Sequence, residues 1–440
     1  MNLPAILFTV LAAFFLLRLP RQWAAVPLLI GATYMSMESS LDLGALHFTS
    51  IRLLVAIGVF RVMSRGERIA GGLNQLDRLL IAWAVWTVCS SCFHKDFSAA
   101  LIYRLGLAFN VLGFYFLTRV FIPDADNFLK ICKVIIIALV PIALEMAFEA
   151  GTGRNLFSLF GGVQELSEIR AGKIRAQGPF GHSILAGTVG AVCLPLAILF
   201  WKSNRKLALL GLAVTGSMVL TSRSSGPMMT AIFACLGLAL WRCRQYMRLI
   251  RWGAVLGIFA VGMMMNAPIY YILDRIDLTG SSTGWHRAYL IQSAIEHVGD
   301  WWMGGTDYTR DWTPESGYND NETDITNHYI RMAVWGGLPM LLLFVGSLVV
   351  AFRMVAKVLR EDKGAPRHDQ FLLWILGCIL FGHVTAMVSV SYFDQSVFYL
   401  YFVLAVIATV QAVPAAETKR EPEMVVDAPA NHEGDLCNHC

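Results

Sequence analysis

Arginine and histidine side chains at the ends of apolar segments are the residues whose chemistry stands out. Arg175 lies just before one apolar segment, and Arg223 sits in a short Ser/Gly turn between two others. Arg287 follows Gly-Trp-His in a polar stretch, while His328 and Arg331 open a further apolar segment, one helical turn apart. Because a guanidinium can bind two phosphate oxygens at once, the arginines predict a site for a phosphorylated anion. A histidine beside them is a candidate general base.

The stretch 275–327 is a long polar interruption of a largely apolar chain. It is rich in Trp, Tyr, Asp and Gly. Function resides disproportionately in long structured loops, so we expect the chemistry in this stretch and in the shorter loops on its side of the molecule. Its acidic residues show no recognised ligand spacing, so we expect neither a metal ion nor another cofactor there.

The elements that must position these residues are membrane helices. The chain is 56% hydrophobic and 15% charged, whereas a soluble domain carries about 25% charged residues. Only helices satisfy every backbone group of a short apolar run inside lipid. The sequence therefore predicts an all-α, polytopic membrane bundle of 12–13 transmembrane helices with one large loop outside the bilayer. The thirteen apolar runs, of which the first two are short, are 3–17, 23–37, 50–64, 79–93, 101–121, 131–149, 183–201, 206–221, 226–241, 252–272, 329–356, 370–391 and 395–413.

The distribution of basic residues orients this bundle. Lys and Arg cluster after every second apolar run, and the positive-inside rule places such clusters in the cytoplasm. The N-terminus and the loops 150–182 and 273–328 are then predicted to lie outside. We expect residues 1–413 to form one transmembrane domain and residues 414–440, rich in Pro, Glu and Ala, to form a disordered cytoplasmic tail. The sequence contains no Walker A loop and no Gly-rich dinucleotide fingerprint, so a bound nucleotide is not expected to drive the activity.

Four stretches together resemble the O-antigen ligase and polysaccharide polymerase superfamily. Residues 175–187 contain Arg followed by Gly-Pro-Phe and lead into an apolar run, and residues 220–226 are similar to a Thr-x-Ser-Arg-Gly turn. Residues 284–289 and 302–305 resemble the opening of the superfamily's large outer loop, and residues 326–338 resemble its closing His…Gly-Leu helix. The order and spacing of these stretches carry the resemblance, because each of them alone is loose.

The resemblance implies a metal-independent glycosyltransferase of the bacterial inner membrane, with its site facing the periplasm. Such enzymes transfer a glycan from undecaprenyl pyrophosphate to an acceptor hydroxyl. Arg175, Arg223 and Arg287 would hold the pyrophosphate, assisted by Arg331, and His328 would take the acceptor proton. Aromatic side chains of the outer loop would stack on sugar rings, and these are Trp285, Trp301, Trp302, Tyr308 and Trp312.

Two residues are alternatives to His328 as the base. Trp335 stands where members of the superfamily often carry an acidic residue, and Lys173 or Glu165 could replace the histidine. Two further arginines of the loop 150–182, Arg154 and Arg170, are expected to be interfacial side chains that extend to lipid phosphates.

The acceptor distinguishes two enzymes of the same type. A polymerase would use another lipid-linked glycan, and a ligase would use the lipid A core; the long aromatic loop favours the polymerase. A transporter or flippase for lipid-linked glycans is the alternative from another class, because ionisable residues lie in or beside apolar runs, namely Arg104, Glu145, Glu149, His383 and Asp394. The sequence shows no pair of matching halves, which favours the enzyme. The expected partners are the glycan donor, the acceptor, membrane lipids and flippase or export proteins, but not nucleic acid.

Overall fold

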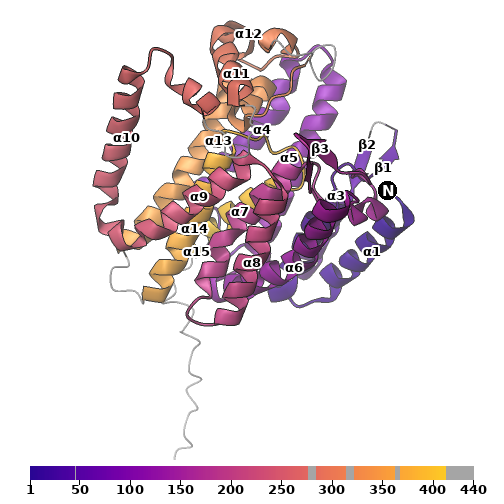
Figure 1. The fold of residues 1–440 in the computed structure, drawn as a ribbon. Coiled ribbons are helices and arrows are strands. Elements are labelled where there is room, and N and C mark those ends of the chain that lie inside the picture. Colours follow the sequence, from indigo (N-terminus) through magenta and orange to yellow (C-terminus); the bar gives the residue numbers. More distant parts are fainter. Residues whose placement is uncertain (45, 276–283, 314–321, 362–366, 413–440) are drawn as a thin grey trace, which may run out of the picture.

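The computed structural model of the chain is a mostly helical bundle that describes residues 1–44, 46–275, 284–313, 322–361 and 367–412 (Figure 1). The helices of the bundle are α1 (Leu3–Arg18), α2 (Ala25–Tyr34), α3 (Ser50–Arg65), α4 (Gln75–Cys89), α5 (Phe97–Phe121), α6 (Ala125–Thr152), α7 (Ser183–Leu199), α8 (Arg205–Thr221), α9 (Ser225–Ala239), α10 (Met247–Met264), α13 (His328–Glu361), α14 (Arg367–Ala386) and α15 (Val397–Ala412). Between α10 and α13 lie α11 (Gly284–Glu296) and α12 (Val298–Trp301). The strands are β1 (Ser40–Leu43), β2 (Leu46–Thr49), β3 (Glu168–Arg170) and β4 (Lys173–Arg175).

Each of the thirteen predicted apolar runs coincides with one helix of the bundle. In the described part of the chain, five helical spans are long and apolar enough to cross a membrane, and these are Gln75–Phe93, Phe97–Phe121, Ala125–Thr152, Ser225–Met264 and His328–Arg360. Four shorter helices are also apolar, namely α1, α7, α14 and α15. The mostly helical class is therefore confirmed, and the number of helices that cross a membrane stays a prediction. The predicted tail 414–440 lies outside the described residues.

The structure contains two short antiparallel hairpins. The all-α prediction did not include them and was wrong in this respect. β1 pairs with β2, and β3 pairs with β4. The second hairpin is closed by Ala171 and Gly172, whose φ angles are 50° and 71°. Two consecutive positive φ angles are typical of the tight turn that matches the twist of paired strands. This turn places Glu168 directly opposite Arg175.

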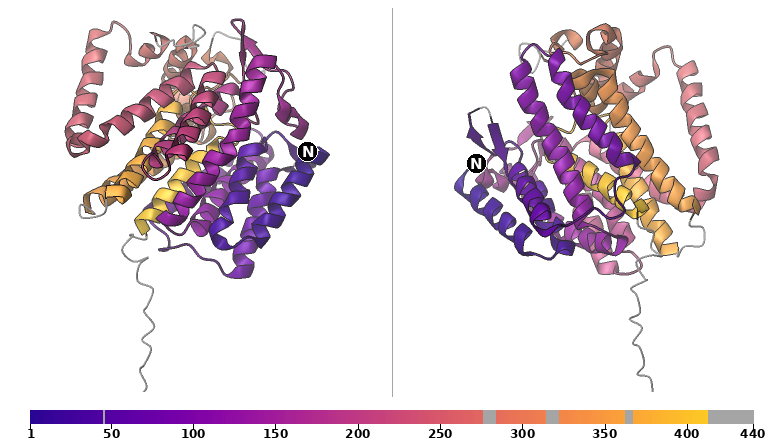
Figure 2. Two further views of the ribbon diagram at one scale, coloured as in Figure 1. Left: turned by 60° about the horizontal axis from the view of Figure 1, so that its bottom comes forward. Right: turned by 180° about the vertical axis from the view of Figure 1, so that it is seen from behind.

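The bundle has an apolar interior, and some of its helices also carry apolar side chains on their outer faces. α15 is buried along its length, from Phe398 to Ala408, as expected for a helix that is apolar on every side. By contrast, α10 has no buried residue and stands at the side of the bundle in every view (Figures 1 and 2). Its large side chains, such as Trp252 and Phe259, are exposed. An apolar helix with exposed apolar side chains is suited to a lipid environment.

Two buried arginines of the bundle are paired with carboxylates. Arg119 forms an ion pair with Asp77, and both side chains are fully buried. The other carboxylate oxygen of Asp77 accepts a hydrogen bond of 2.7 Å from the Tyr115 hydroxyl. Arg61, also fully buried, donates to Glu67 at 2.9 Å. A buried charge needs such partners because it has lost its hydration, so these pairs hold the helices in place.

The polar stretch after α10 forms a folded unit and not an open loop. α11, α12 and the short turn η6 (Arg310–Trp312) lie together at one end of the bundle, at the top in Figure 1. We call these three elements the outer assembly. It shares a small hydrophobic core with the first turns of α13, made of Leu290, Ala294, Trp301, Trp312, Ile325, Ile330, Ala333 and Val334. The outer assembly is therefore fixed relative to the bundle.

α13 is broken at Gly336 and Gly337, and the outer assembly contacts the break. Gly337 has a φ of +72°. A Cβ atom at this position would lie 2.4 Å from the carbonyl oxygen of Met303, so only glycine fits. The backbone N–H of Leu338 donates across the break to the carbonyl of Trp302 at 2.7 Å. The two glycine-containing motifs that the sequence places more than thirty residues apart therefore meet in space.

Candidate anion-binding site

The segment that follows Arg175 is held by a buried carboxylate of α6. Both the N–H of Gln177 and the N–H of Gly178 donate to Oε2 of Glu149, at 3.0 and 2.8 Å. The hydroxyl of Ser167 donates to Oε1 of the same carboxylate at 2.8 Å. Glu149 thus fixes the backbone on both sides of the β3–β4 hairpin. This arrangement explains how a loop residue, Arg175, can be presented in one orientation.

Arg175 is buried, and its guanidinium is only partly used. Its side chain is 4% exposed, and Nη1 donates to Oε2 of Glu168 at 2.8 Å. Nη2 lies 3.5 Å from the Ser224 hydroxyl at the start of α9. Nε is buried and has no hydrogen-bond partner among the described residues. Burial lowers the pKa of Arg175, Glu168 opposes this shift, and the charge of Arg170 adds to it.

Arg287, from α11, lies close enough to Arg175 for the two charges to interact. It is 8% exposed, and its Nε donates to the backbone carbonyl of Ser389 at 3.1 Å. Neither Nη has a partner in the ranges that the structure describes. Burial lowers the pKa of Arg287, and the charges of Arg170 and Arg175 lower it further. We call Arg175 and Arg287 the buried arginine pair. Because their positive charges are only partly balanced by carboxylates, binding of an anion would stabilise the pair.

Glu168 and His182 complete the neighbourhood of Arg175. Nε2 of His182 lies 3.6 Å from Oε2 of Glu168. Nδ1 of the same ring accepts a hydrogen bond of 3.1 Å from the N–H of Ile184 and so caps α7. Because Nδ1 is an acceptor, the proton of the neutral ring lies on Nε2, facing Glu168. Burial lowers the pKa of His182, as does the charge of Arg175.

The loop 387–396 links the buried arginine pair to His328, a connection that the sequence did not predict. The N–H of His328 donates to the carbonyl of Met387 at 2.9 Å, two residues before the Ser389 carbonyl that binds Arg287. The N–H of Gly181 donates to Oδ2 of Asp394 at 2.8 Å, so the loop also holds the segment after Arg175. A run of Ser, Asp and Gln between two apolar runs was the signal available in the sequence.

His328 uses one ring nitrogen, Nδ1, as a hydrogen-bond acceptor inside the protein. Its side chain is 2% exposed, and Nδ1 accepts a hydrogen bond of 3.2 Å from the backbone N–H of Tyr392. The ring packs edge-on against Phe344, with the centroids 5.3 Å apart. A neutral imidazole held in this way carries its proton on the other nitrogen. The geometry favours a role in positioning the loop 387–396 over proton abstraction.

Arg331 belongs to a different cluster from the buried arginine pair. Its Nη2 lies 3.3 Å from the Ile325 carbonyl, and its Cζ lies 5.5 Å from the centroid of the Trp335 ring. Its charge acts on the hydroxyl of Tyr103 on α5, together with that of Arg104. These contacts are made with residues other than the arginine pair, and the predicted assistance of Arg331 in pyrophosphate binding stays a prediction.

Arg223 lies beside the site with its side chain exposed. It has a φ of +46°, an uncommon conformation for a residue other than glycine. The adjacent Ser224, and not Arg223, makes the contact with Arg175. The predicted phosphate-binding turn is therefore close to the buried arginine pair, but it contributes a hydroxyl. Arg170, expected to be an interfacial side chain, instead lies near enough to act on both members of the pair.

The predicted sugar-binding aromatics divide into two groups. Trp285, Trp302 and Tyr308 are 38%, 48% and 44% exposed, so their faces are accessible. Trp301 and Trp312 are 8% and 2% exposed and belong to the core of the outer assembly. Burial excludes stacking on a substrate, so the prediction was wrong for Trp301 and Trp312. Trp285, Trp302 and Tyr308 stay predicted substrate contacts.

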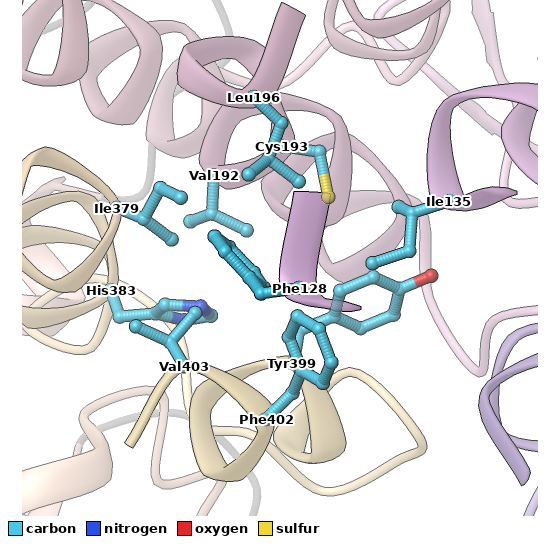
Figure 3. Close-up of a pocket in the computed structure, with 10 residues that line it drawn as sticks. All are labelled: Phe128, Ile135, Val192, Cys193, Leu196, Ile379, His383, Tyr399, Phe402 and Val403. Atoms are coloured by element: carbon cyan, nitrogen blue, oxygen red, sulfur yellow. The ribbon is translucent and has the colours of Figure 1, made fainter. Parts of the chain in front are cut away.

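A cavity inside the bundle is too small to be a substrate site. It has a volume of about 10 Å³ and lies where α6, α7, α14 and α15 meet, with His383 pointing into it (Figure 3). Its lining is otherwise almost entirely apolar. Such a volume holds at most one water molecule. This cavity is therefore not the candidate site, which lies at the buried arginine pair.

Comparison with protein-family models, with curated proteins and with solved structures finds no match to this chain. The fold and the buried arginine pair are thus the observations on which a function can be based, together with the resemblance of the motifs.

Proposed function

We propose that the chain is a polytopic inner-membrane glycosyltransferase, similar to polysaccharide polymerases, whose site faces the periplasm. The alternation of basic loops and the exposed apolar faces of helices such as α1, α5 and α10 support the membrane location. In this topology the outer assembly, the β3–β4 hairpin and the loop 387–396 share the outer side. Arg175 and Arg287 lie among them.

The proposed reaction moves a glycan from undecaprenyl pyrophosphate to a sugar hydroxyl. Arg175 and Arg287 bind the pyrophosphate and stabilise the negative charge that grows as the glycosidic C–O bond breaks. The exposed aromatic faces of Trp285, Trp302 and Tyr308 lie on the outer assembly and provide surfaces for sugar rings. The pyrophosphate leaving group supplies the driving force, so the reaction needs no nucleotide.

One observation carries this proposal. Two arginines from distant parts of the chain are each buried, the charge of Arg175 acts on Arg287, and several of their N–H groups lack partners among the described residues. Two other buried arginines of the bundle, Arg61 and Arg119, have carboxylate partners, and a third, Arg104, contacts Ser90 and His94. A pair kept without sufficient counter-charge is costly to the fold, and binding of an anion explains why it is present.

The polymerase is preferred to the ligase because the outer assembly offers an extended aromatic surface. A ligase that transfers the glycan to the lipid A core would use the same arginines. The contacts of three ionisable residues argue against the transporter. Glu149 and Asp394 bind backbone N–H groups, and Arg104 donates to the Ser90 hydroxyl at 2.6 Å. Groups with such fixed structural partners are poor candidates for an ion or substrate path.

The test is a transfer assay in proteoliposomes. Purified protein is supplied with an undecaprenyl-pyrophosphate-linked glycan, and the size of the glycan is followed on a gel. We expect chains to lengthen with the wild type. Arg287→Lys should lower turnover by about 10- to 100-fold, because it removes one or more charge-assisted hydrogen bonds.

The matched control is Arg154→Lys, which changes an exposed arginine of the same face and should be nearly silent. A glycan that changes sides without changing size would identify a transporter instead. Equal effects of the two substitutions would remove the basis for the arginine pair as the pyrophosphate site.

A further inference from the structure

We propose that Glu168 is the general base that takes the proton from the acceptor hydroxyl. This inference rests on the proposed glycosyl transfer and assigns a step in it to a residue that the motifs do not contain. Glu168 lies on β3, directly opposite Arg175 on β4, so the hairpin fixes the two side chains relative to each other.

The carboxylate of Glu168 is held by one oxygen and open at the other. Oε2 accepts from Nη1 of Arg175 at 2.8 Å and faces Nε2 of His182 at 3.6 Å. Oε1 has no partner in the described part of the chain, and the side chain is 43% exposed. An acceptor hydroxyl can therefore reach Oε1, and the proton can leave to water afterwards.

Arg175 can hold Glu168 and a phosphate at the same time. Nη1 is occupied by Glu168, whereas Nε has no partner and Nη2 has only the long contact to Ser224. The free edge therefore points away from Glu168. Hydrogen bonds of usual length on opposite sides of one guanidinium separate the two partners by roughly 6–8 Å. Carboxyl groups of inverting glycosidases are separated by about 6.5–9.5 Å, which leaves room for the attacking oxygen.

In the proposed step, one C–O bond forms while another C–O bond breaks. The acceptor oxygen attacks the anomeric carbon and forms the new C–O bond, while its proton passes to Oε1 of Glu168. The bond between the anomeric carbon and the pyrophosphate oxygen breaks, and its electron pair leaves with the pyrophosphate. Arg175 and Arg287 stabilise that charge. Attack from the side opposite the leaving group gives inversion at the sugar.

Four other ionisable groups around the site are already engaged. Both oxygens of Glu149 and both oxygens of Asp394 accept hydrogen bonds. The Nδ1 atoms of His182 and His328 each accept from a backbone N–H. Glu168 is the group beside Arg175 that combines a free proton-accepting atom with access to solvent.

The experiment compares Glu168→Gln with Glu296→Gln in the full chain. The glutamine carbonyl can still accept from Arg175, but the amide cannot take a proton at neutral pH. We expect Glu168→Gln to lower kcat by about 10²–10⁴-fold, with unchanged binding of undecaprenyl pyrophosphate, and Glu168→Asp to restore part of the activity. Glu296 is an exposed residue of α11 whose carboxylate accepts a hydrogen bond from Gln292 within the same helix, so its substitution should be silent.

The outcomes separate this inference from the proposed function. If wild-type protein does not lengthen the glycan, the glycosyltransferase proposal itself fails. If wild-type protein is active and Glu168→Gln keeps its kcat, Glu168 is not the base. If Glu168→Gln abolishes binding of undecaprenyl pyrophosphate, the carboxylate only positions Arg175, and the inference is likewise overturned.

Discussion

Replacing Arg287 by methionine should separate the stability of this protein from its function. Among the residues that the structure describes, Arg287 has one hydrogen-bond partner, the Ser389 carbonyl, and it experiences the repulsion of Arg170 and Arg175. Loss of a hydrogen bond made by a charged group costs about 1.5–3 kcal/mol. Removal of a desolvated charge that lacks a counter-charge offsets this by a similar amount, since replacing buried charge with well-packed apolar groups is often neutral or stabilising. We therefore expect the free energy of unfolding to change by less than about 1 kcal/mol.

The control for this prediction is Arg119→Met, in which the same change removes a paired charge. Arg119 and Asp77 are both fully buried. Breaking a buried pair leaves one charge without a partner and costs about 3–5 kcal/mol. Thermal unfolding in detergent should therefore give a clearly lower Tm for Arg119→Met and a nearly unchanged Tm for Arg287→Met.

The same assay reports binding when undecaprenyl pyrophosphate is added. A ligand that binds the folded state raises its Tm, and we expect this rise for the wild type but not for Arg287→Met. A loss of stability in Arg287→Met as large as that in Arg119→Met would refute the reasoning. Arg287 would then be a structural residue, and the buried arginine pair would not be a site built for an anion.

Three further predictions concern the topology, the break in α13 and the aromatics. A cysteine placed at Asp311 should react with an impermeant reagent from outside, while one at Glu417 should not; labelling of both from one side would exclude the topology. Gly337→Ala should lower the Tm strongly, because the added Cβ would meet a backbone carbonyl at 2.4 Å, and a variant as stable as wild type would contradict this fit. Trp301→Ala should destabilise the protein by about 3–5 kcal/mol through loss of core packing, whereas Trp302→Ala should keep the Tm and raise the KM for the glycan; the reverse pattern would show that their assignments are exchanged.

The candidate site was only partly accessible from the sequence. The type and position of Arg175 and Arg287 indicated an anion site, and the structure places the two near each other. The motif around Arg223 led to a turn beside Arg175, where Ser224 contacts Arg175 and Arg223, which has a positive φ angle, has an exposed side chain. A one-residue difference of this kind depends on backbone angles that residue types alone do not reveal. The predicted phosphate contact of Arg223 stays a prediction.

The helices and their apolar faces follow from local properties of the sequence. Thirteen runs of apolar side chains coincide with thirteen helices, since a run of this kind satisfies its own backbone hydrogen bonds wherever it packs. The alternation of basic loops is equally local, and it alone gives the predicted orientation in the membrane.

Only the tertiary structure decided which side chains meet. It joined Arg175 and Glu168 through a hairpin, brought Ser389 to Arg287, and placed the backbone of Met303 against Gly337. These contacts connect residues that are distant in the chain, or depend on the φ and ψ angles of a turn, and their energies arise only when the helices pack. For this reason the residue types predicted an anion site, while the arrangement of its candidate donors and candidate base depends on the fold.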